Sequence, residues 1–228
     1  AMEAQGTRIT QNLLHDNQRP EFAEQLKGGM TCQDIFVEVS HGPTLIDNNI
    51  LLSDVSLRIA TQGVAMVHNL CAGSFTYVGD GTSWRYTPYH MPHRTEVMGF
   101  MTFLHGDDRI YNNIFIQKWS AKDLELLNDS DPTEKYVENR KVGTYCFDEY
   151  PTYDKWIKMF DMDTVYPDMR KHEDAHFAHL PVWIDGNAYF LGAKPWKNEK
   201  NKLVDKSKKA RVDVVEKNGE YFLDTNLL

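Results

Sequence analysis

The chain has 228 residues, 41% of them hydrophobic and 25% charged, so it is long enough to bury a core and its composition excludes wholesale disorder. A formal net charge of −8 argues against nucleic acid and against an anionic membrane as partners. The sequence has no apolar run of about 18 residues and no signal-peptide pattern at its start, so we expect no membrane partner.

The three cysteines, Cys32, Cys71 and Cys146, have neither a metal-binding nor a disulfide-framework spacing. We expect reduced, mostly buried thiols. Reduced thiols favour a cytoplasmic location, and secretion is not excluded.

Both ends of the chain indicate a piece of a longer polypeptide. A strand pattern starts almost at once, at Gln5-Gly6-Thr7-Arg8, and residues 221–228 have the pattern of a strand that ends in the middle of a sheet. We therefore expect the remaining segments of the same polypeptide as packing partners. A homo-oligomer is also left open.

A short apolar stretch followed by asparagine recurs five times, at Asn12, Asn49, Asn69, Asn113 and Asn187. The steps between these asparagines are 37, 20, 44 and 74 residues. A coil of roughly 20 to 23 residues makes the step of 20 one turn, the step of 44 two turns and the step of 37 one turn plus a loop; the step of 74 needs a larger excursion. Asparagine tolerates the left-handed conformation of a corner, and stacked asparagines hydrogen-bond along a ladder. The repeat predicts an all-β fold, a parallel β-helix (solenoid); a β-sandwich with asparagine in its turns is the alternative.

The strand from Asp34 to Val39 alternates strictly between apolar and other residues. If Ile35, Val37 and Val39 fill the interior, Glu38 stands on the outer face. Neighbouring coils lie about 4.8 Å apart, so a carboxylate on the adjacent coil would approach the separation of about 5 to 5.5 Å found in retaining glycosidases. The partner should come from the coil before Glu38, near residue 1, where Glu3 is the acidic residue. An ordinary solvated glutamate is the alternative interpretation.

Residues 84–96 are rich in rings and hydrogen-bond donors, including Tyr89, His90 and His93, and their prolines exclude a helix. Such a loop suits pyranose recognition, although it could equally be a packed loop under a lid. His90, His93 and Glu96 are disfavoured as metal ligands because no regular secondary structure supports their spacing. We expect neither a metal nor a cofactor.

The segment Gly106-Asp107-Asp108-Arg109 leads into a strand of the repeat. Either aspartate could cap a turn, pair with the arginine or bind substrate. The histidines 172, 176 and 179 are a weak zinc signal that indicates packing and surface instead.

The excursion between Asn113 and Asn187 is expected to be an insertion with short helices over about 119–180, packed against the coils. It includes a short helix at Ala121–Asn128 and an amphipathic stripe that begins after Pro151-Thr152, formed by Tyr153, Trp156, Ile157 and Phe160. We place the coils in residues 1–195. Residues 196–228 are expected to hold a lysine-rich linker and a hairpin turned by Asn218-Gly219, as partial strands of a β-sandwich.

Several strings occur together in a fixed order in this sequence. They are Gln5-Gly6-Thr7-Arg8-Ile9, residues 34–43 (DIFVEVSHGP) with Asp47-Asn48-Asn49, residues 87–93 and residues 106–113. In this order they resemble the right-handed parallel β-helix proteins of glycoside hydrolase family 120, the β-xylosidases. The resemblance covers most of residues 5–116 and returns at residues 181–195.

The resemblance implies a retaining mechanism, with an Asp nucleophile on one coil and a Glu acid/base on the next. Glu38 matches the glutamate of the family's strand motif. The family's nucleophile falls at or just before residue 1, where Ala1 stands, so either the Asp lies outside this chain or the protein is inactive. Residues 18–32 read as an extra loop between the two catalytic coils.

The expected substrate is a xylo-oligosaccharide or a related β-linked sugar, with xylose released from the non-reducing end. The residues expected to bind it are His41, Tyr89, His90, His93, Asp107 and Arg109. Two alternatives stay open: a non-catalytic carbohydrate-binding or structural β-helix module, and a lyase acting on uronates. The lyase ranks last because it needs basic residues or Ca²⁺ for the substrate carboxylate, whereas this chain is acidic.

Overall fold

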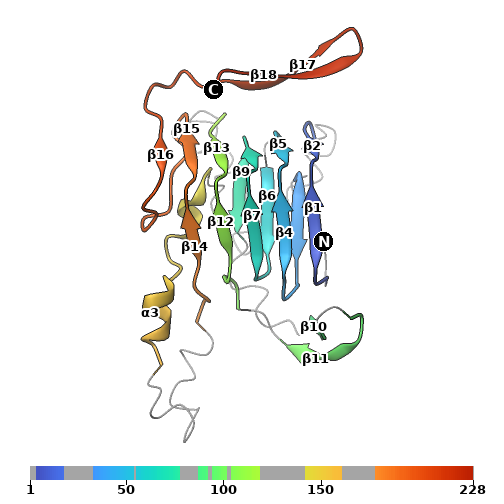
Figure 1. Ribbon diagram of the computed structural model, residues 1–228, viewed down its shortest axis with the longest axis vertical. Helices are drawn as coiled ribbons and strands as arrows, with labels where there is room; N and C mark the ends of the chain where they lie inside the picture. The colour runs from blue at the N-terminus through green and yellow to red at the C-terminus, as the bar shows by residue number, and fades with distance from the viewer. Residues whose placement is uncertain are drawn as a thin grey trace, which may run out of the picture.

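The computed structural model describes residues 4–17, 33–53, 55–77, 87–91, 94–101, 104–118, 142–160 and 178–227. Within these ranges the chain is nearly all β with very little helix, and most of its strands lie in three parallel sheets (Figure 1). None of the described helices is long and apolar enough to cross a membrane.

The three parallel sheets are built from short strands that are mostly two to four residues long. In spatial order, the first sheet contains β1 (Thr7–Thr10), β4 (Thr44–Asp47), β7 (Val64–Val67), β12 (Arg109–Tyr111) and β14 (Trp183–Asp185). The second contains β16 (Leu203–Val204), β15 (Ala188–Phe190), β13 (Ile114–Ile116), β8 (Leu70–Cys71), β5 (Ile50–Leu51) and β2 (Leu13–Leu14). The third contains β3 (Ile35–Glu38), β6 (Val55–Ala60) and β9 (Ser74–Tyr77).

The chain visits these sheets in a repeating cycle. β3, β4 and β5 belong to the third, first and second sheets, and β6, β7 and β8 repeat that order one strand further along each sheet. Each cycle is one coil, and its strands pair in parallel with those of the next coil. This strand order is consistent with the β-helix-like fold that the repeat predicts.

The five repeated asparagines stack in one ladder at the turn between the first and second sheets. The backbone N and the Nδ2 of each asparagine donate to the Oδ1 of the next, from Asn12 to Asn49, Asn69, Asn113 and Asn187, at 2.9 to 3.1 Å. From Asn49 onward, each Nδ2 also donates to a backbone carbonyl of the preceding coil. The ladder therefore satisfies buried polar groups along the whole stack, as the repeat predicts.

Two details of the repeat prediction are wrong. The left-handed residue of each corner is the one before the ladder asparagine, namely Gln11, Asn48, His68, Asn112 and Gly186. The step of 44 residues is not two coils: β12 pairs directly with β7, and Asn113 stacks directly on Asn69. The long steps of 44 and 74 residues each span one rung, because the extra chain leaves the stack and returns to it. The step of 37 is one turn plus a loop, as expected.

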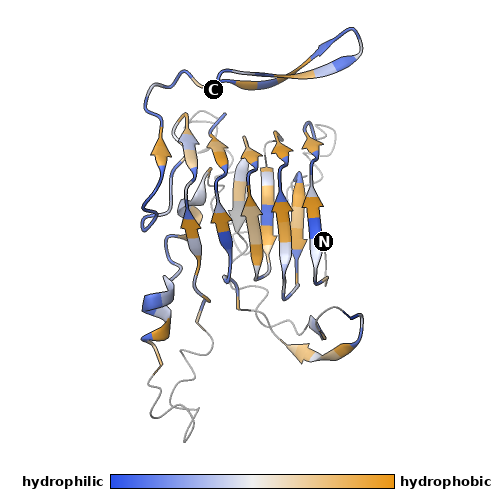
Figure 2. Cartoon of the chain, viewed as in Figure 1, coloured by the Kyte–Doolittle hydropathy of each residue, from blue (hydrophilic) through white to orange (hydrophobic). Residues whose placement is uncertain are grey.

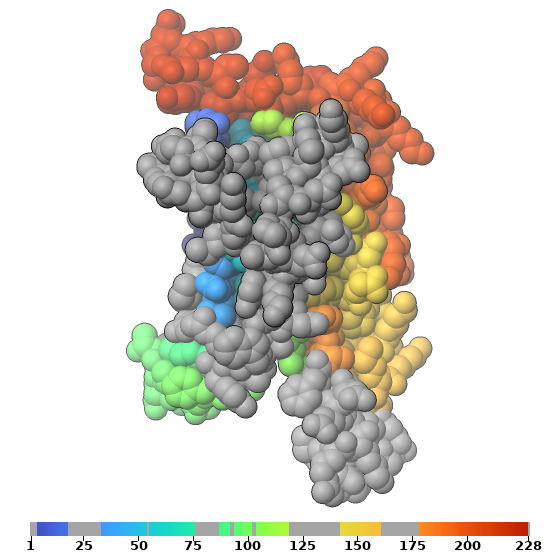
Figure 3. Space-filling view, turned by 180° about the vertical axis from the view of Figure 1, so that it is seen from behind, coloured from blue at the N-terminus to red at the C-terminus, as the bar shows by residue number. Residues whose placement is uncertain are grey.

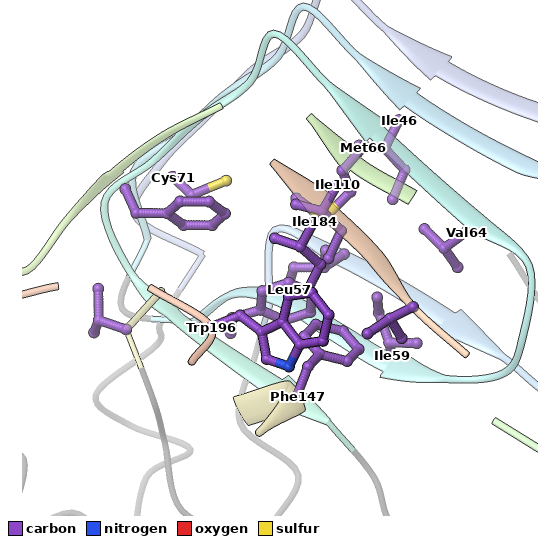
Figure 4. Close-up of a cluster of buried hydrophobic side chains, with 14 of the residues drawn as sticks. Ile46, Leu57, Ile59, Val64, Met66, Cys71, Ile110, Phe147, Ile184 and Trp196 are labelled. Atoms are coloured by element: carbon purple, nitrogen blue, oxygen red, sulfur yellow. The ribbon is translucent and has the colours of Figure 1, made fainter. Parts of the chain in front are cut away.

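The inward-facing side chains of the three sheets meet in one apolar core (Figure 4), and the strands that supply them are rich in hydrophobic residues (Figure 2). Alternate strand residues such as Ile46, Met66 and Ile110 occupy the same register on successive coils and are fully buried. Burial of such a side chain contributes about 1.5 to 3 kcal/mol. Cys71 is buried in the same cluster, and Cys71 and Cys146 are free thiols.

Residues 142–160 do more than decorate the coils. They contain a 3-10 helix, η2 (Thr144–Phe147), and a short helix, α3 (Tyr153–Ile157), which Thr152 caps by accepting a hydrogen bond from the backbone N of Lys155. The helix begins after Pro151-Thr152, as expected, but it ends at Ile157, before Phe160. Of the predicted stripe, Trp156, Ile157 and Phe160 are half-buried, whereas Tyr153 is exposed. Phe147 is fully buried and packs edge-on against Phe75 of β9, so this segment fills the core next to the third sheet. The expected helix at Ala121–Asn128 lies outside the described residues.

The last part of the chain combines an edge strand and a hairpin. Trp196 and Glu199 are buried, and β16 joins the second sheet beside β15, so the segment expected to be a linker contributes to the coils. β17 (Val212–Lys217) and β18 (Glu220–Thr225) pair antiparallel around Asn218-Gly219, whose φ angles of 57° and 79° suit a tight hairpin turn. This confirms the hairpin; whether it belongs to a sandwich stays a prediction, as does the division at residue 196.

Candidate functional site

A hollow of about 1200 Å³ opens on the outer face of the coils, between the first sheet and a hairpin. The hairpin is formed by β10 (Thr87–His90) and β11 (Val97–Met101), and it lies at the opposite end of the molecule from β17 and β18 (Figures 1 and 3). The sequence prediction of an irregular loop over residues 84–96 is wrong for 87–90. Pro88 is compatible with a strand there because β10 pairs on one side only among the described strands.

The floor of the pocket consists of small residues at the ends of adjacent coils, including Gly42, Gly63 and Ala65. Gly42 has a φ of 69°, and a Cβ at this position would lie 2.7 Å from the backbone oxygen of Gly63. Because the two coils approach so closely, a side chain does not fit between them.

Polar contacts hold the hairpin over this floor. Thr87 Oγ1 lies 2.6 Å from His41 Nε2, and the His41 ring meets the Tyr89 ring edge-on at 5.6 Å. The backbone N of His90 donates to Gln5 Oε1 at 2.6 Å, so the hairpin is also tied to the first coil. Burial lowers the pKa of His41, so its imidazole is neutral at neutral pH and can both donate and accept a hydrogen bond.

Asp107 and Arg109 form the opposite side of the pocket. Arg109 Nη1 donates to Asp107 Oδ1 at 2.9 Å and to the Asp107 backbone oxygen at 2.8 Å. The guanidinium carbon also lies 4.4 Å from the centre of the Trp183 ring. Both charged groups are about half exposed, so the pocket presents an anchored donor beside an acceptor.

Asp108 has a different role from Asp107. It is fully buried, its Oδ1 accepts a hydrogen bond from the backbone N of Val64 at 2.8 Å, and its Oδ2 has no partner within the described part of the chain. Burial raises the pKa of this carboxyl well above its ordinary value. Of the roles that the sequence left open, Asp107 is the arginine partner and Asp108 is a cap on the adjacent coil.

Glu38 lies on the outer face of the coils, as expected, but it is not among the residues that line the pocket. Ile35, Val37 and Val39 are buried, while Phe36 and Glu38 are half-buried on the other face. Glu38 stands three residues before His41, at the end of β3. Its neighbour on the following coil is Ala60, which carries no carboxylate, and among the described strands β3 has no partner on its other side.

The structure brings most of the predicted binding residues together. His41, Tyr89, His90, Asp107 and Arg109 all line the pocket, and His93 lies outside the described residues. Gln5, Arg94 and Glu96 also line the pocket, although they are not among the residues predicted by name to bind substrate. Arg94 and Glu96 belong to the segment 84–96 that is predicted to suit pyranose recognition, and Gln5 belongs to the first of the strings that carry the family resemblance.

No group of three or more metal-ligating side chains occurs in the described ranges. Histidines 172 and 176 fall outside these ranges. His179 stacks on the Tyr150 ring at 4.4 Å, and its Nδ1 lies 3.1 Å from the Leu104 backbone oxygen. This placement agrees with the packing interpretation of that histidine.

No protein-family model and no curated protein matches this sequence. Among solved structures, the chain is similar to XylC, whose structure was solved in complex with xylose. The two share 35% sequence identity with a TM-score of 0.74. The match covers 99% of this chain and 29% of XylC, so the chain corresponds to less than a third of that protein's length and resembles it over nearly all of its own.

Proposed function

We propose that this protein is a retaining glycoside hydrolase that releases xylose from the non-reducing end of β-xylo-oligosaccharides, with Glu38 as general acid/base. The observation that carries the proposal is the similarity to XylC, a protein solved with xylose bound. The sequence resemblance to the β-xylosidases of glycoside hydrolase family 120 supports the same substrate class. We also propose a right-handed parallel β-helix as the fold and the cytoplasm as the location.

The chemistry of the pocket supports a neutral sugar as the ligand. A neutral imidazole at His41, an arginine paired with an aspartate and the ring of Tyr89 surround the same hollow. Sugar hydroxyls both donate and accept hydrogen bonds, and the apolar face of a pyranose packs on aromatic rings. Arg109 is paired with Asp107, and Arg94 Nη1 lies 3.7 Å from Glu96 Oε2, so each of the two arginines among the described pocket residues already has a carboxylate partner and neither requires an anionic ligand.

The position of Glu38 supports its assignment as acid/base, because it is a half-buried carboxyl on the outer face next to the chain turn that enters the pocket at His41. The nucleophile Asp is proposed at or just before residue 1, one coil earlier. Parallel coils about 4.8 Å apart would bring the two carboxyls close to the separation of about 5 to 5.5 Å that a double displacement needs.

Replacing Glu38 with glutamine in the protein that contains this chain tests the assignment. We expect E38Q to slow hydrolysis of xylobiose by about 100-fold or more, since its leaving group needs a proton. Hydrolysis of β-xylosyl fluoride should be affected far less, because fluoride leaves without protonation. E216Q, which changes an exposed glutamate of the hairpin β17–β18, is the control and should hydrolyse both substrates like the wild type. Equal losses on both substrates in E38Q would argue against Glu38 as the acid.

A second candidate function is a carbohydrate-binding module without catalysis. It is favoured by one observation, that Glu38 does not line the pocket. In that case xylobiose would bind, as measured by calorimetry, and its binding would weaken in an Arg109→Ala variant, but neither xylobiose nor β-xylosyl fluoride would be hydrolysed. Turnover of β-xylosyl fluoride by the wild type would exclude this alternative.

A further inference from the structure

The outer face of the first sheet continues past the pocket onto the next coil. Parallel pairing places Ala65, Arg109 and Trp183 in register on three successive coils. Ala65 and Arg109 line the pocket, whereas Trp183 is the next residue along the same row. Coils about 4.8 Å apart put Trp183 about 10 Å from Ala65, far enough to contact a second sugar when the first occupies the pocket.

Three side chains form a continuous stack in this direction. The Arg109 guanidinium lies over the Trp183 ring at 4.4 Å, and the Trp183 ring stacks against Tyr153 at 6.3 Å with an angle of 28° between the planes. Tyr153 is the first residue of α3, and 48% of it is exposed. In Figure 1, α3 lies beside β14 at the edge of the stack. The stack therefore leads from the pocket wall to an exposed aromatic ring.

The composition of this stack matches the surface of a sugar. Aromatic rings pack on the C–H face of a pyranose, and the guanidinium edge donates to its hydroxyls. Arg109 is held from two sides, by Asp107 and by the Trp183 ring, so its donors are oriented before a ligand binds. Pre-oriented groups lose less conformational entropy on binding.

We propose that Arg109, Trp183 and Tyr153 form a second sugar-binding subsite, which takes the leaving-group part of a β-linked xylo-oligosaccharide while the pocket holds the sugar that is released. The proposal rests on the proposed function for the assignment of the two sides. Tyr153 is the farthest of the three from the pocket, so only a substrate longer than one sugar can reach it. We therefore expect Tyr153 to set the preference for longer substrates.

The test compares two substrates in Tyr153→Ala and Trp183→Phe variants of the protein that contains this chain. Xylotriose occupies the second subsite, whereas β-xylosyl fluoride reaches only the pocket. We expect each variant to lower kcat/KM for xylotriose by about two- to tenfold, the effect of one aromatic contact, through a higher KM. kcat/KM for β-xylosyl fluoride should stay at the wild-type value in Tyr153→Ala, because Tyr153 is not among the residues that line the pocket. In Trp183→Phe, whose ring contacts Arg109, the loss on xylotriose should exceed the loss on β-xylosyl fluoride. Tyr221→Ala is the matched control, because Tyr221 is an exposed tyrosine on the hairpin at the far end of the molecule.

Each outcome decides the proposal. An equal loss on both substrates would show a structural role of the stack, and unchanged kinetics on both would show no role, so either result overturns the subsite. If the wild type hydrolyses neither substrate, the proposed function fails and the subsite is tested by calorimetry with xylotriose. Weaker binding in Tyr153→Ala than in Tyr221→Ala then supports the subsite, and equal binding overturns it.

Discussion

Asp107 and Asp108 are adjacent in the sequence but lie in opposite environments. Asp107 is 43% exposed and paired with Arg109, whereas Asp108 is fully buried next to the backbone of Val64. Asp107 has a left-handed φ of 55° in the turn before β12, so its side chain leaves the chain in a different direction from that of Asp108. Within β12, alternation places Arg109 on the pocket side and Ile110 in the core.

Asp108→Asn should stabilise the protein at neutral pH. Burial raises the folded-state pKa of Asp108 above its unfolded value of about 3.9. At a pH where the carboxyl ionises in the unfolded chain, the buried Asp108 therefore lowers the free energy of unfolding. The stability of the wild type therefore falls relative to D108N as pH rises from about 4 through the folded-state pKa, and the difference vanishes below about pH 3. Urea unfolding of both proteins at several pH values measures it.

An opposite pattern would contradict the environment assigned to Asp108. If the stability difference between D108N and the wild type were the same at pH 7 as at pH 3, the folded protein would not penalise the charged form of Asp108. Asp213→Asn is the control, since Asp213 is an exposed residue of β17. Its stability should follow the wild type across the range.

At the scale of strands and turns, the sequence predicted what local chemistry determines. The recurring asparagines, the alternation of residues 34–39, the start of a helix after Pro151-Thr152 and the Asn218-Gly219 turn are all confirmed. The number of coils could not be predicted from the spacing of the asparagines. A spacing of 44 residues fits two coils as well as one coil with a long loop, and the sequence alone does not show on which strand the chain rejoins the stack. The ring-rich segment was read as a loop because the antiparallel partner of β10, β11, lies outside it.

Gly106 marks the place where the longest excursion rejoins the stack. It has a φ of 90°, its backbone oxygen accepts from the backbone N of Gly63, and a Cβ added to it would collide with the backbone carbonyl of Leu180. The neighbouring His105 oxygen accepts from the backbone N of Leu180, so two segments far apart in sequence meet without room for a side chain.

Gly106→Ala should destabilise the protein by about 1 to 3 kcal/mol, because alanine is strained at this φ and displaces the returning chain. Urea unfolding measures the loss. Gly99→Ala serves as the control, since a Cβ at Gly99 has no atom within 4 Å, and its effect should stay within about 0.5 kcal/mol. Equal stability of both variants would mean that the 178–182 segment is not held at Gly106.

At the scale of the whole molecule, the sequence predicted the residues that line the pocket better than it predicted the distance of Glu38, the proposed acid/base, from that pocket. His41, Tyr89, His90, Asp107 and Arg109 meet in one pocket because the coils stack in register and the hairpin folds back over them. The face on which Glu38 lies follows from alternation. Its distance from the pocket depends instead on how the turn between the third and first sheets is built, and no local pattern encodes that geometry.

The asparagine ladder ends at a carboxylate rather than at another asparagine. Glu199 Oε1 accepts from the backbone N and the Nδ2 of Asn187, at 3.0 and 2.9 Å, and its Oε2 accepts from the Tyr189 hydroxyl at 2.6 Å. Burial and this hydrogen bond raise the pKa of Tyr189, so its hydroxyl stays protonated and donates. The glutamate thus satisfies the last donors of a ladder that runs from Asn12 through all five repeats.

Removing that cap should weaken the stack from one end. Glu199→Ala removes the acceptor of the Asn187 backbone N, whereas Asn187 Nδ2 keeps Ile110 O and the Tyr189 hydroxyl keeps Thr144 Oγ1 as partners, so the loss should be about 1 to 3 kcal/mol. Glu199→Gln keeps an acceptor for Asn187 and should cost less, about 0.5 to 1 kcal/mol. Because each coil contacts only its neighbours, hydrogen exchange should accelerate at β14, β15 and β16 and stay unchanged at β1 and β4. Uniform acceleration along the chain would show instead that the coils unfold as one unit, and that the ladder distributes the loss of its last acceptor over every rung.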